Sequence, residues 1–313
     1  MRSSSETYLE KALSEYNEAV NALEPDGPSE ELLEAYVNRG CVLSMLEHYT
    51  SAMEDVVTAS EMAESMEVDD GTYVKLYCMM GELSDRFGID PAEPLSKAAS
   101  RLGPVGPGSR HFDMRGLVRT CILSAELLMT GGDYEACLPF LEKAEECTYS
   151  KLDAWSLNRR MEALDLLGES RRETGDPEGA ETLYEEAADI GKTLMERNSL
   201  EDLESLAAVY MAKAECDLDL GMLDTFVSDS DKAVAIIKEM RELGLIDGLG
   251  EASDMCHNVS SELMKAGRTK DAESYLMKAL SLSLEEARRY SGGGNEDGQR
   301  PRLHALPSSR LPG

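Results

Sequence analysis

The chain has 313 residues, which suffices for two compact domains or for one elongated array of repeats. Its 61 acidic and 31 basic residues give a formal net charge of −30 at pH 7. This charge argues against binding to nucleic acid or to anionic membrane surfaces, because both would repel the protein. Apolar residues make up 42% of the chain and aromatic residues only 5%, a composition that suits thin layers of packed helices.

The first expected helix stands alone and carries Ala12, Tyr16 and Ala19. The sequence Pro-Asp-Gly-Pro at residues 25–28 ends it, because such a run cannot continue a helix. A pair of antiparallel helices is expected next. Its marker residues are Gly40, Ala52, Val56 and Ala59, with Glu47 at the turn where glycine is typical.

A second pair starts with Gly81 in its first helix and Gly88 at its turn. Prolines 91 and 94 then disturb it, and the small–large–small pattern of the second helix is replaced by Glu93, Lys97 and Ser100. Residues 103–108 read Gly-Pro-Val-Gly-Pro-Gly, which no helix accommodates. We expect a hinge at residues 103–110 between an N-terminal domain of residues 1–102 and a C-terminal domain of residues 111–290. The alternative is a loop folded over a binding groove.

Residues 111–290 contain four further pairs with a common spacing. The clearest copy has Gly168, then Gly175, Ala180, Tyr184 and Ala187 at offsets of 7, 12, 16 and 19 residues. The last copy has Ser260, Gly267, Ala272, Leu276 and Ala279. The two remaining copies are less regular and carry Ala125, Gly132, Cys137, Leu141 and Ala144, and Ala214, Gly221, Phe226, Ser230 and Ala233. Residues 291–313 turn to Gly, Pro, Ser and Arg and are expected to be disordered.

This spacing has a physical reason. Two helices that pack closely need a small residue where their axes approach, and a turn glycine supplies the left-handed conformation that ends the first helix. The residues at offsets 12, 16 and 19 share one face of the second helix. Around Gly175, Asp176 is expected to cap the next helix and Pro177 to occupy its first position.

The arrangement resembles the tetratricopeptide repeat (TPR), on the strength of Leu167-Gly168, Gly175-Asp176, Ala180, Tyr184 and Ala187. The small residues that end the pattern, Ala144, Ala187, Ala233 and Ala279, are 43, 46 and 46 residues apart, so the repeats resemble the long variety of the family. The resemblance implies an all-α, right-handed solenoid of antiparallel helix pairs. It also implies a protein-interaction scaffold or adaptor that holds a partner segment in a concave groove.

One pattern suggests where a partner binds. The small residue of the first helix is followed by glutamate in four pairs, at Glu82, Glu126, Glu169 and Glu215. In the family the residue at this position tends to line the groove, so these four carboxylates would form an acidic ladder. Further groove candidates are Asp165, Arg172, Met211, Asp219 and His257. The expected partner is a protein or peptide segment rich in Lys or Arg. The alternative is that each glutamate pairs with an Arg or Lys, for which Arg172 and Arg86 are candidates.

No motif indicates chemistry. The four histidines are far apart in sequence, no phosphate-binding glycine loop is present, and no catalytic residue, metal ligand or cofactor is expected. Seven scattered cysteines without a C-x-x-C pair fit reduced, buried thiols in a cytoplasmic protein, and no apolar run is long enough to span a membrane. The sequence therefore predicts a protein that is not an enzyme.

Three questions stay open at this point. The acidic surface either attracts a basic partner or keeps the protein soluble in a salty cytoplasm. The protein is either a scaffold or a ligand-responsive sensor whose two arms close about the Gly/Pro break. Exposed apolar faces at the ends of the array could also drive self-association.

Overall fold

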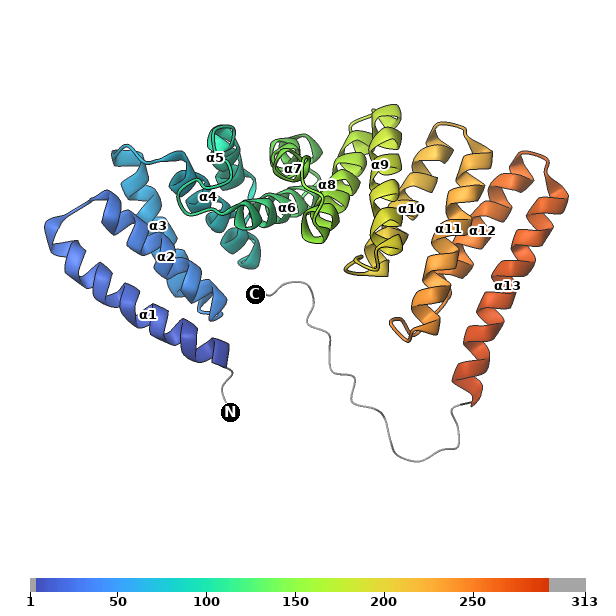
Figure 1. Cartoon of the computed structure of the whole chain (residues 1–313), viewed down its shortest axis with the longest axis horizontal. Helices are drawn as coiled ribbons and strands as arrows, with labels where there is room; N and C mark the ends of the chain where they lie inside the picture. The colour runs from blue at the N-terminus through green and yellow to red at the C-terminus, as the bar shows by residue number, and fades with distance from the viewer. Residues whose placement is uncertain (1–3, 293–313) are drawn as a thin grey trace. The chain divides into compact units, whose positions relative to one another are not determined.

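A computed structural model describes residues 4–292, which form α-helices and one short 3-10 helix and contain no strand (Figure 1). Two compact units divide the chain between Ala233 and Val234. Unit 1 contains α1 (Ser4–Leu23), η1 (Glu24–Asp26), α2 (Glu30–Met45), α3 (Tyr49–Ser65), α4 (Asp70–Arg86), α5 (Ala92–Leu102), α6 (Met114–Thr130), α7 (Tyr134–Thr148), α8 (Ala154–Glu173), α9 (Pro177–Glu196) and α10 (Leu203–Asp219). Helix α11 (Leu223–Glu242) crosses the boundary, and unit 2 contains α12 (Gly250–Lys265) and α13 (Thr269–Gly292).

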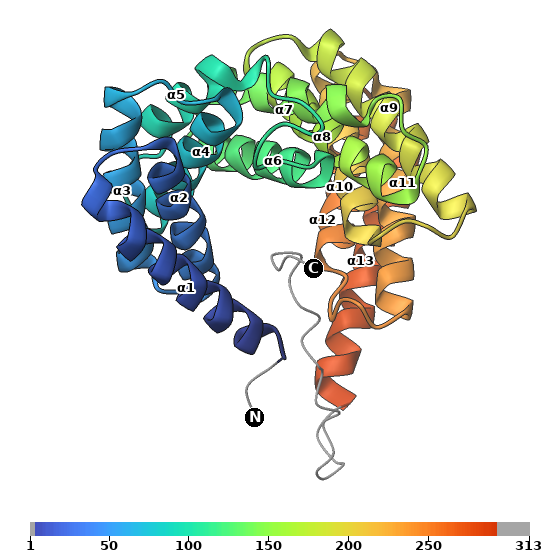
Figure 2. The same ribbon diagram turned by 60° about the vertical axis from the view of Figure 1, so that its left-hand side comes forward.

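The expected all-α solenoid of helix pairs is confirmed. In unit 1, α2 packs on α3, α4 on α5, α6 on α7 and α8 on α9, while α1 packs on α2. Each first helix also contacts the first helix of the next pair, so α2, α4, α6, α8 and α10 form one continuous layer (Figure 2). We call this layer the first-helix face. No described helix is long and apolar enough to cross a membrane.

The turn at Gly175 has the predicted geometry. Gly175 has a φ of +88°, a conformation that an L side chain rarely adopts. The Asp176 side chain accepts a hydrogen bond of 3.0 Å from the Gly179 amide, and Pro177 is the first residue of α9. At the first pair Glu47 adopts the same left-handed conformation, with a φ of +63°, without being a glycine.

The small residues lie where helices approach most closely. A Cβ atom added to Gly168 would be 2.6 Å from Cε1 of Tyr184, and one added to Gly81 would be 2.7 Å from Cγ of Leu95. The second contact corrects the sequence prediction for the second pair. Helix α5 does pack against α4, with a register that places Leu95 and Ala98 in the core in place of Glu93 and Lys97. Pro94 is tolerated because it lies in the first turn, where its missing N–H costs nothing.

The Gly/Pro segment after α5 packs inside unit 1. Val105 and Phe112 are buried, and the Lys143 Nζ atom donates a 2.9 Å hydrogen bond to the Gly103 carbonyl. The two compact units separate elsewhere, after Ala233. A hinge at residues 103–110 between residues 1–102 and 111–290 stays a prediction about motion. Residues 293–313 of the expected disordered tail lie outside the described part of the chain.

Unit 2 uses serine as well as alanine at its helix contact. Ser260 Oγ donates to the Ala272 carbonyl at 2.8 Å, which brings α12 close to α13. Leu276 was expected to fill the large position of the pattern, but it is exposed and Tyr275 is buried in its place. Helix α13 exposes large apolar side chains, among them Leu276, Met277, Leu280 and Leu284. Self-association through these residues stays a prediction.

Candidate functional site: the acidic face of unit 1

Acidic side chains gather on the first-helix face where α6, α8 and α10 adjoin. Glu126, Glu169 and Glu215 each follow the small buried residue that contacts another helix, so they lie on the same side of successive helices. Glu126 interacts electrostatically with Glu162 of α8, and Glu215 with Glu169. We define the acidic face as Glu126, Glu162, Asp165, Glu169, Glu215 and Asp219. Glu82 lies on α4, one pair nearer the N-terminus.

Glu82 and two carboxylates of the acidic face are half-buried and costly to ionise. Burial raises the pKa of Glu82 to about 7, and Arg86 offsets this only in part. Burial, together with Glu126 and other nearby acids, raises the pKa of Glu162 to about 7 against the opposing effect of Arg159. Asp165 has its pKa raised to about 7 by burial and by the negative charges of Glu169 and Glu162. These groups are therefore only partly ionised at neutral pH.

Some carboxylates of this face form ion pairs within the described part of the protein, and others do not. Arg172 Nη1 lies 2.6 Å from a carboxylate oxygen of Glu215, and its Nε is 3.9 Å from Asp219. Arg86 stacks over the Tyr49 ring, 4.5 Å from the centroid. Among the described residues, no hydrogen bond or ion pair engages the carboxylates of Asp165 and Glu169. Burial also raises the pKa of Glu169, and the nearby Arg172 charge opposes that shift.

Tyr184 adds a hydroxyl group near the acidic face. The sequence pattern predicted this residue only as a large side chain that packs between helices. Its ring comes from α9, crosses α8 at Gly168 and is fully buried. Its hydroxyl oxygen has no hydrogen-bond partner in the described part of the chain. Burial is the main cause of the raised pKa of this phenol, and the charge of Asp165 is the next largest. The hydroxyl therefore lies beside the acidic face, buried and unsatisfied.

The chain also matches a known family. Residues 253–286, which cover most of α12 and α13, match the family model of the tetratricopeptide repeat. The helix pair in this stretch is therefore similar to a tetratricopeptide repeat. The helix pairs of the chain are long, because the first helices begin at Glu30, Asp70, Met114, Ala154, Leu203 and Gly250, which are 40 to 49 residues apart. No curated protein matches the chain in sequence.

Several solved structures are similar to this chain at low sequence identity. YrrB, a TPR protein with an unusual peptide-binding site, has a TM-score of 0.49 and 15% identity over 69% of this chain and 90% of that one. The C-terminal part of a TPR protein from Cytophaga hutchinsonii has a TM-score of 0.45 and 13% identity over 92% and 99%. A Rap protein complexed with competence and sporulation factor has a TM-score of 0.36 and 15% identity over 92% and 89%.

Two further candidate residues carry no charge into the acidic face. Met211 is half-buried on α10, four residues before Glu215, and His257 is exposed on α12 of unit 2. Glu162, which the sequence analysis did not single out, belongs to the face because it lies three residues before Asp165 on α8. Glu162, Asp165 and Glu169 are spaced three and four residues apart, and this spacing in the sequence would have identified Glu162 as a neighbour of the other two.

A second group of charges lies where α9, α10 and α11 meet. Lys213 of α10 is buried, and its Nζ atom is 3.1 Å from Glu181, 3.4 Å from Asp217 and 3.1 Å from Asp229. Burial raises the pKa of Asp217 to about 6, although Lys213 opposes the shift. The cluster joins α9, α10 and α11 within unit 1, and its burial gives it a structural role.

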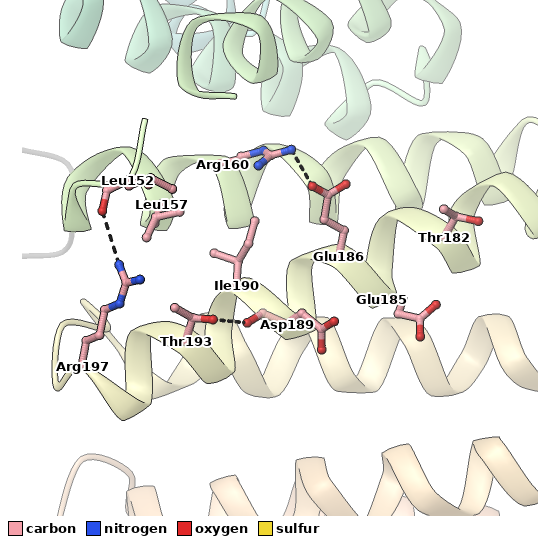
Figure 3. A pocket seen from close by; sticks show the side chains of 10 residues that line it. All are labelled: Leu152, Leu157, Arg160, Thr182, Glu185, Glu186, Asp189, Ile190, Thr193 and Arg197. Carbon is pink, nitrogen blue, oxygen red and sulfur yellow. Dashed lines mark hydrogen bonds and ion pairs between the residues drawn. The ribbon is translucent and has the colours of Figure 1, made fainter. Parts of the chain in front are cut away.

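A depression of about 540 Å³ lies on another side of α8 and α9 (Figure 3). Charges of both signs line it, and several are already paired: Arg160 contacts Glu186, and Arg197 donates to the Leu152 carbonyl at 3.4 Å. Elsewhere, oxygens of Glu30, Glu34 and Asp69 lie within 4.8 Å of one another, but the Arg110 guanidinium contacts both glutamates. An arginine therefore already supplies positive charge to that cluster.

Proposed function

We propose that this protein is a non-catalytic interaction scaffold whose acidic face binds a Lys- or Arg-rich segment of a protein partner. The observation that carries the proposal is the pair Asp165 and Glu169. These half-buried carboxylates sit between further acids and have no cationic partner bonded to them among the described residues. A positively charged side chain would supply the missing counter-charge.

Architecture and charge both support this function. Stacked helix pairs present an extended surface built from many short elements, which suits recognition of a polypeptide segment. The formal charge of −30 would attract a basic segment over a distance set by the ionic strength. The six residues that define the acidic face are all carboxylates, so they offer counter-charges for a cation. That the protein acts in the cytoplasm remains a prediction from its sequence.

The alternative is a sensor whose arms close about residues 103–110. The buried Val105 and the Lys143 hydrogen bond to Gly103 hold this segment against unit 1, which favours the scaffold. Small-angle scattering with and without a bound basic peptide separates the two functions. An unchanged radius of gyration is expected of the scaffold, and compaction is expected of the sensor.

The binding proposal is tested with a fluorescently labelled peptide of alternating arginine and serine, titrated by anisotropy at pH 8 and low salt. The face variant carries Glu126→Gln, Glu162→Gln, Asp165→Asn and Glu169→Gln. We expect it to bind at least tenfold more weakly than wild type, about 1.4 kcal/mol. Added salt should also weaken wild-type binding.

The matched control removes the same number of charges from exposed positions of α7 and α9, with Glu135, Glu142, Glu185 and Glu196 changed to Gln. Its affinity should stay within about threefold of wild type. Equal losses in the two variants would mean that net charge, and not the acidic face, attracts the peptide. Absence of binding to wild type would overturn the proposed function.

A further inference from the structure

The centre of the acidic face has the parts of a subsite for one side chain. Asp165 and Glu169 are four residues apart on α8, so their carboxylates are neighbours on one side of the helix, about 6 Å apart at Cβ. Helix α8 contacts α6 and α10, which hold it in the middle of the first-helix face. Two carboxylates at this spacing match an ammonium or guanidinium group that bonds to both.

Tyr184 provides a second observation, separate from the two carboxylates, that indicates a ligand at this position. Its ring lies against Gly168, which is between Asp165 and Glu169 in the sequence, because a Cβ atom at Gly168 would be 2.7 Å from Tyr184 Cζ. The side chain is fully buried and its hydroxyl has no partner in the described residues. A buried polar group left without a hydrogen bond costs about 1–3 kcal/mol. An N–H donor placed between the carboxylates would satisfy this oxygen.

The charges around Asp165 leave room for one more cation. On its own helix it faces Glu162 and Glu169, and Tyr184 approaches from α9. The charge of Glu126 on α6 acts on Glu162, and the charge of Glu215 on α10 acts on Glu169. Both neighbouring helices therefore add negative charge near Asp165. The nearest cations are committed elsewhere: Arg172 contacts Glu215 and Glu173, and Arg159 contacts Glu162 and Glu201.

We infer that Asp165, Glu169 and Tyr184 form a subsite for one Lys or Arg side chain of the basic segment, and that occupying it releases a proton. This inference rests on the proposed function. The side chain would bond to both carboxylates and donate to the Tyr184 oxygen. The methylene groups of the incoming residue would cover the carboxylates, while the ion pair keeps them charged.

The proton release follows from the unliganded state. Burial first, and the adjacent negative charges second, raise the pKa of Asp165 to about 7. A bound cation favours the ionised form and lowers that pKa, so binding at pH 6 requires a proton to leave. For one proton with a pKa of about 7, affinity should rise about tenfold between pH 6 and pH 8.

The test measures affinity and protons together, with the arginine–serine peptide blocked at its N-terminal amine, so that no group of the peptide titrates in this range. Anisotropy titrations at pH 6, 7 and 8 and constant ionic strength should give the tenfold rise for wild type. Calorimetry in phosphate and in bis-Tris, which both buffer at pH 6, should show about one proton released at that pH. Asp165→Asn should bind several-fold more weakly at pH 8 and lose most of the pH dependence.

Two further variants separate the subsite from its surroundings. Tyr184→Phe keeps the ring that packs on Gly168, so it should fold normally, bind severalfold more weakly and retain the pH dependence. Glu142→Gln, an exposed change on α7, should behave as wild type throughout. Circular dichroism melting curves would verify that each variant is folded.

The outcomes distinguish this inference from the function on which it rests. Wild-type binding of equal strength at pH 6 and pH 8 would overturn the proton-linked subsite and leave the proposed function standing. A pH dependence that survives in Asp165→Asn would overturn the assignment to this carboxylate. A peptide that binds wild type at no pH would remove the proposed function itself.

Discussion

At the scale of single residues, backbone conformation and close contact decide which amino acid each position accepts. Gly168 leaves room for the Tyr184 ring, and Gly175 takes a conformation that ends α8. The sequence predicted both, because small residues and turn glycines recur at fixed offsets. It could not predict that the Tyr184 hydroxyl is buried with no hydrogen-bond partner among residues 4–292, since this depends on side chains from α8 and α10 that the spacing does not specify.

Glu47 is the residue whose replacement should most simply stabilise the protein. It has a φ of +63° at a turn where the other TPR pairs have glycine. An L residue in this region costs about 1–2 kcal/mol, while glycine costs roughly 0.5–1 kcal/mol in the entropy of the unfolded chain. Glu47→Gly should therefore raise the free energy of unfolding in urea by about 0.5–1 kcal/mol.

The control for that prediction is Glu54→Gly, at an exposed position inside α3. There the backbone is helical, so the change should lower the free energy of unfolding by about 1 kcal/mol. A loss of stability in both variants would show that the turn carries no strain.

At the scale of helices, the pairs with regular punctuation were predictable and the others were not. The pair formed by α8 and α9 follows its spacing from Gly168 to Ala187. Helix α5 was misjudged because Pro91 and Pro94 appeared to interrupt it, whereas both fall at its beginning, and its core residues are shifted to Leu95 and Ala98. Packing against the neighbouring helix decides where such a helix begins and which of its residues face the core. A single sequence does not reveal that packing.

The buried Lys213 is the charge on which the packing of α9, α10 and α11 most depends. Lys213→Met would leave Asp217 buried without a positive neighbour in contact and would remove one of two cations from Asp229. Breaking a buried ion pair from one side costs about 3–5 kcal/mol, and we expect a loss of that order in urea denaturation.

Lys192→Met serves as the comparison, because Lys192 is exposed and forms an ion pair with Asp189 at the surface of α9. That change should cost about 0–1 kcal/mol. A loss below about 1 kcal/mol for Lys213→Met as well would mean that the interior charges contribute no more than surface ones.

At the scale of the whole molecule, buried carboxylates of the first-helix face should make stability depend on pH. The folded state raises the pKa of Glu82, Glu162 and Asp165 to about 7, above the ordinary carboxyl value near 4. Between about pH 4.5 and pH 7 the folded protein therefore holds protons that the unfolded chain has released. The free energy of unfolding should fall as the pH rises through this range.

Urea denaturation at pH 5.5 and pH 8 tests this directly. Wild type should be more stable at pH 5.5, and Glu82→Gln combined with Asp165→Asn should reduce the difference. Glu142→Gln combined with Glu185→Gln removes as many exposed charges and should leave the difference nearly unchanged. Stability that rises with pH would contradict the direction of these pKa shifts.

The central claim is that a basic segment lies on the first-helix face of unit 1. The most direct measurement is amide hydrogen exchange of the wild-type protein with and without the arginine–serine peptide at pH 8. We predict slower exchange in α6, α8 and α10, with little change in α7 and α9. Protection confined to the second helices, or to the depression between Leu152 and Arg197, would contradict the account.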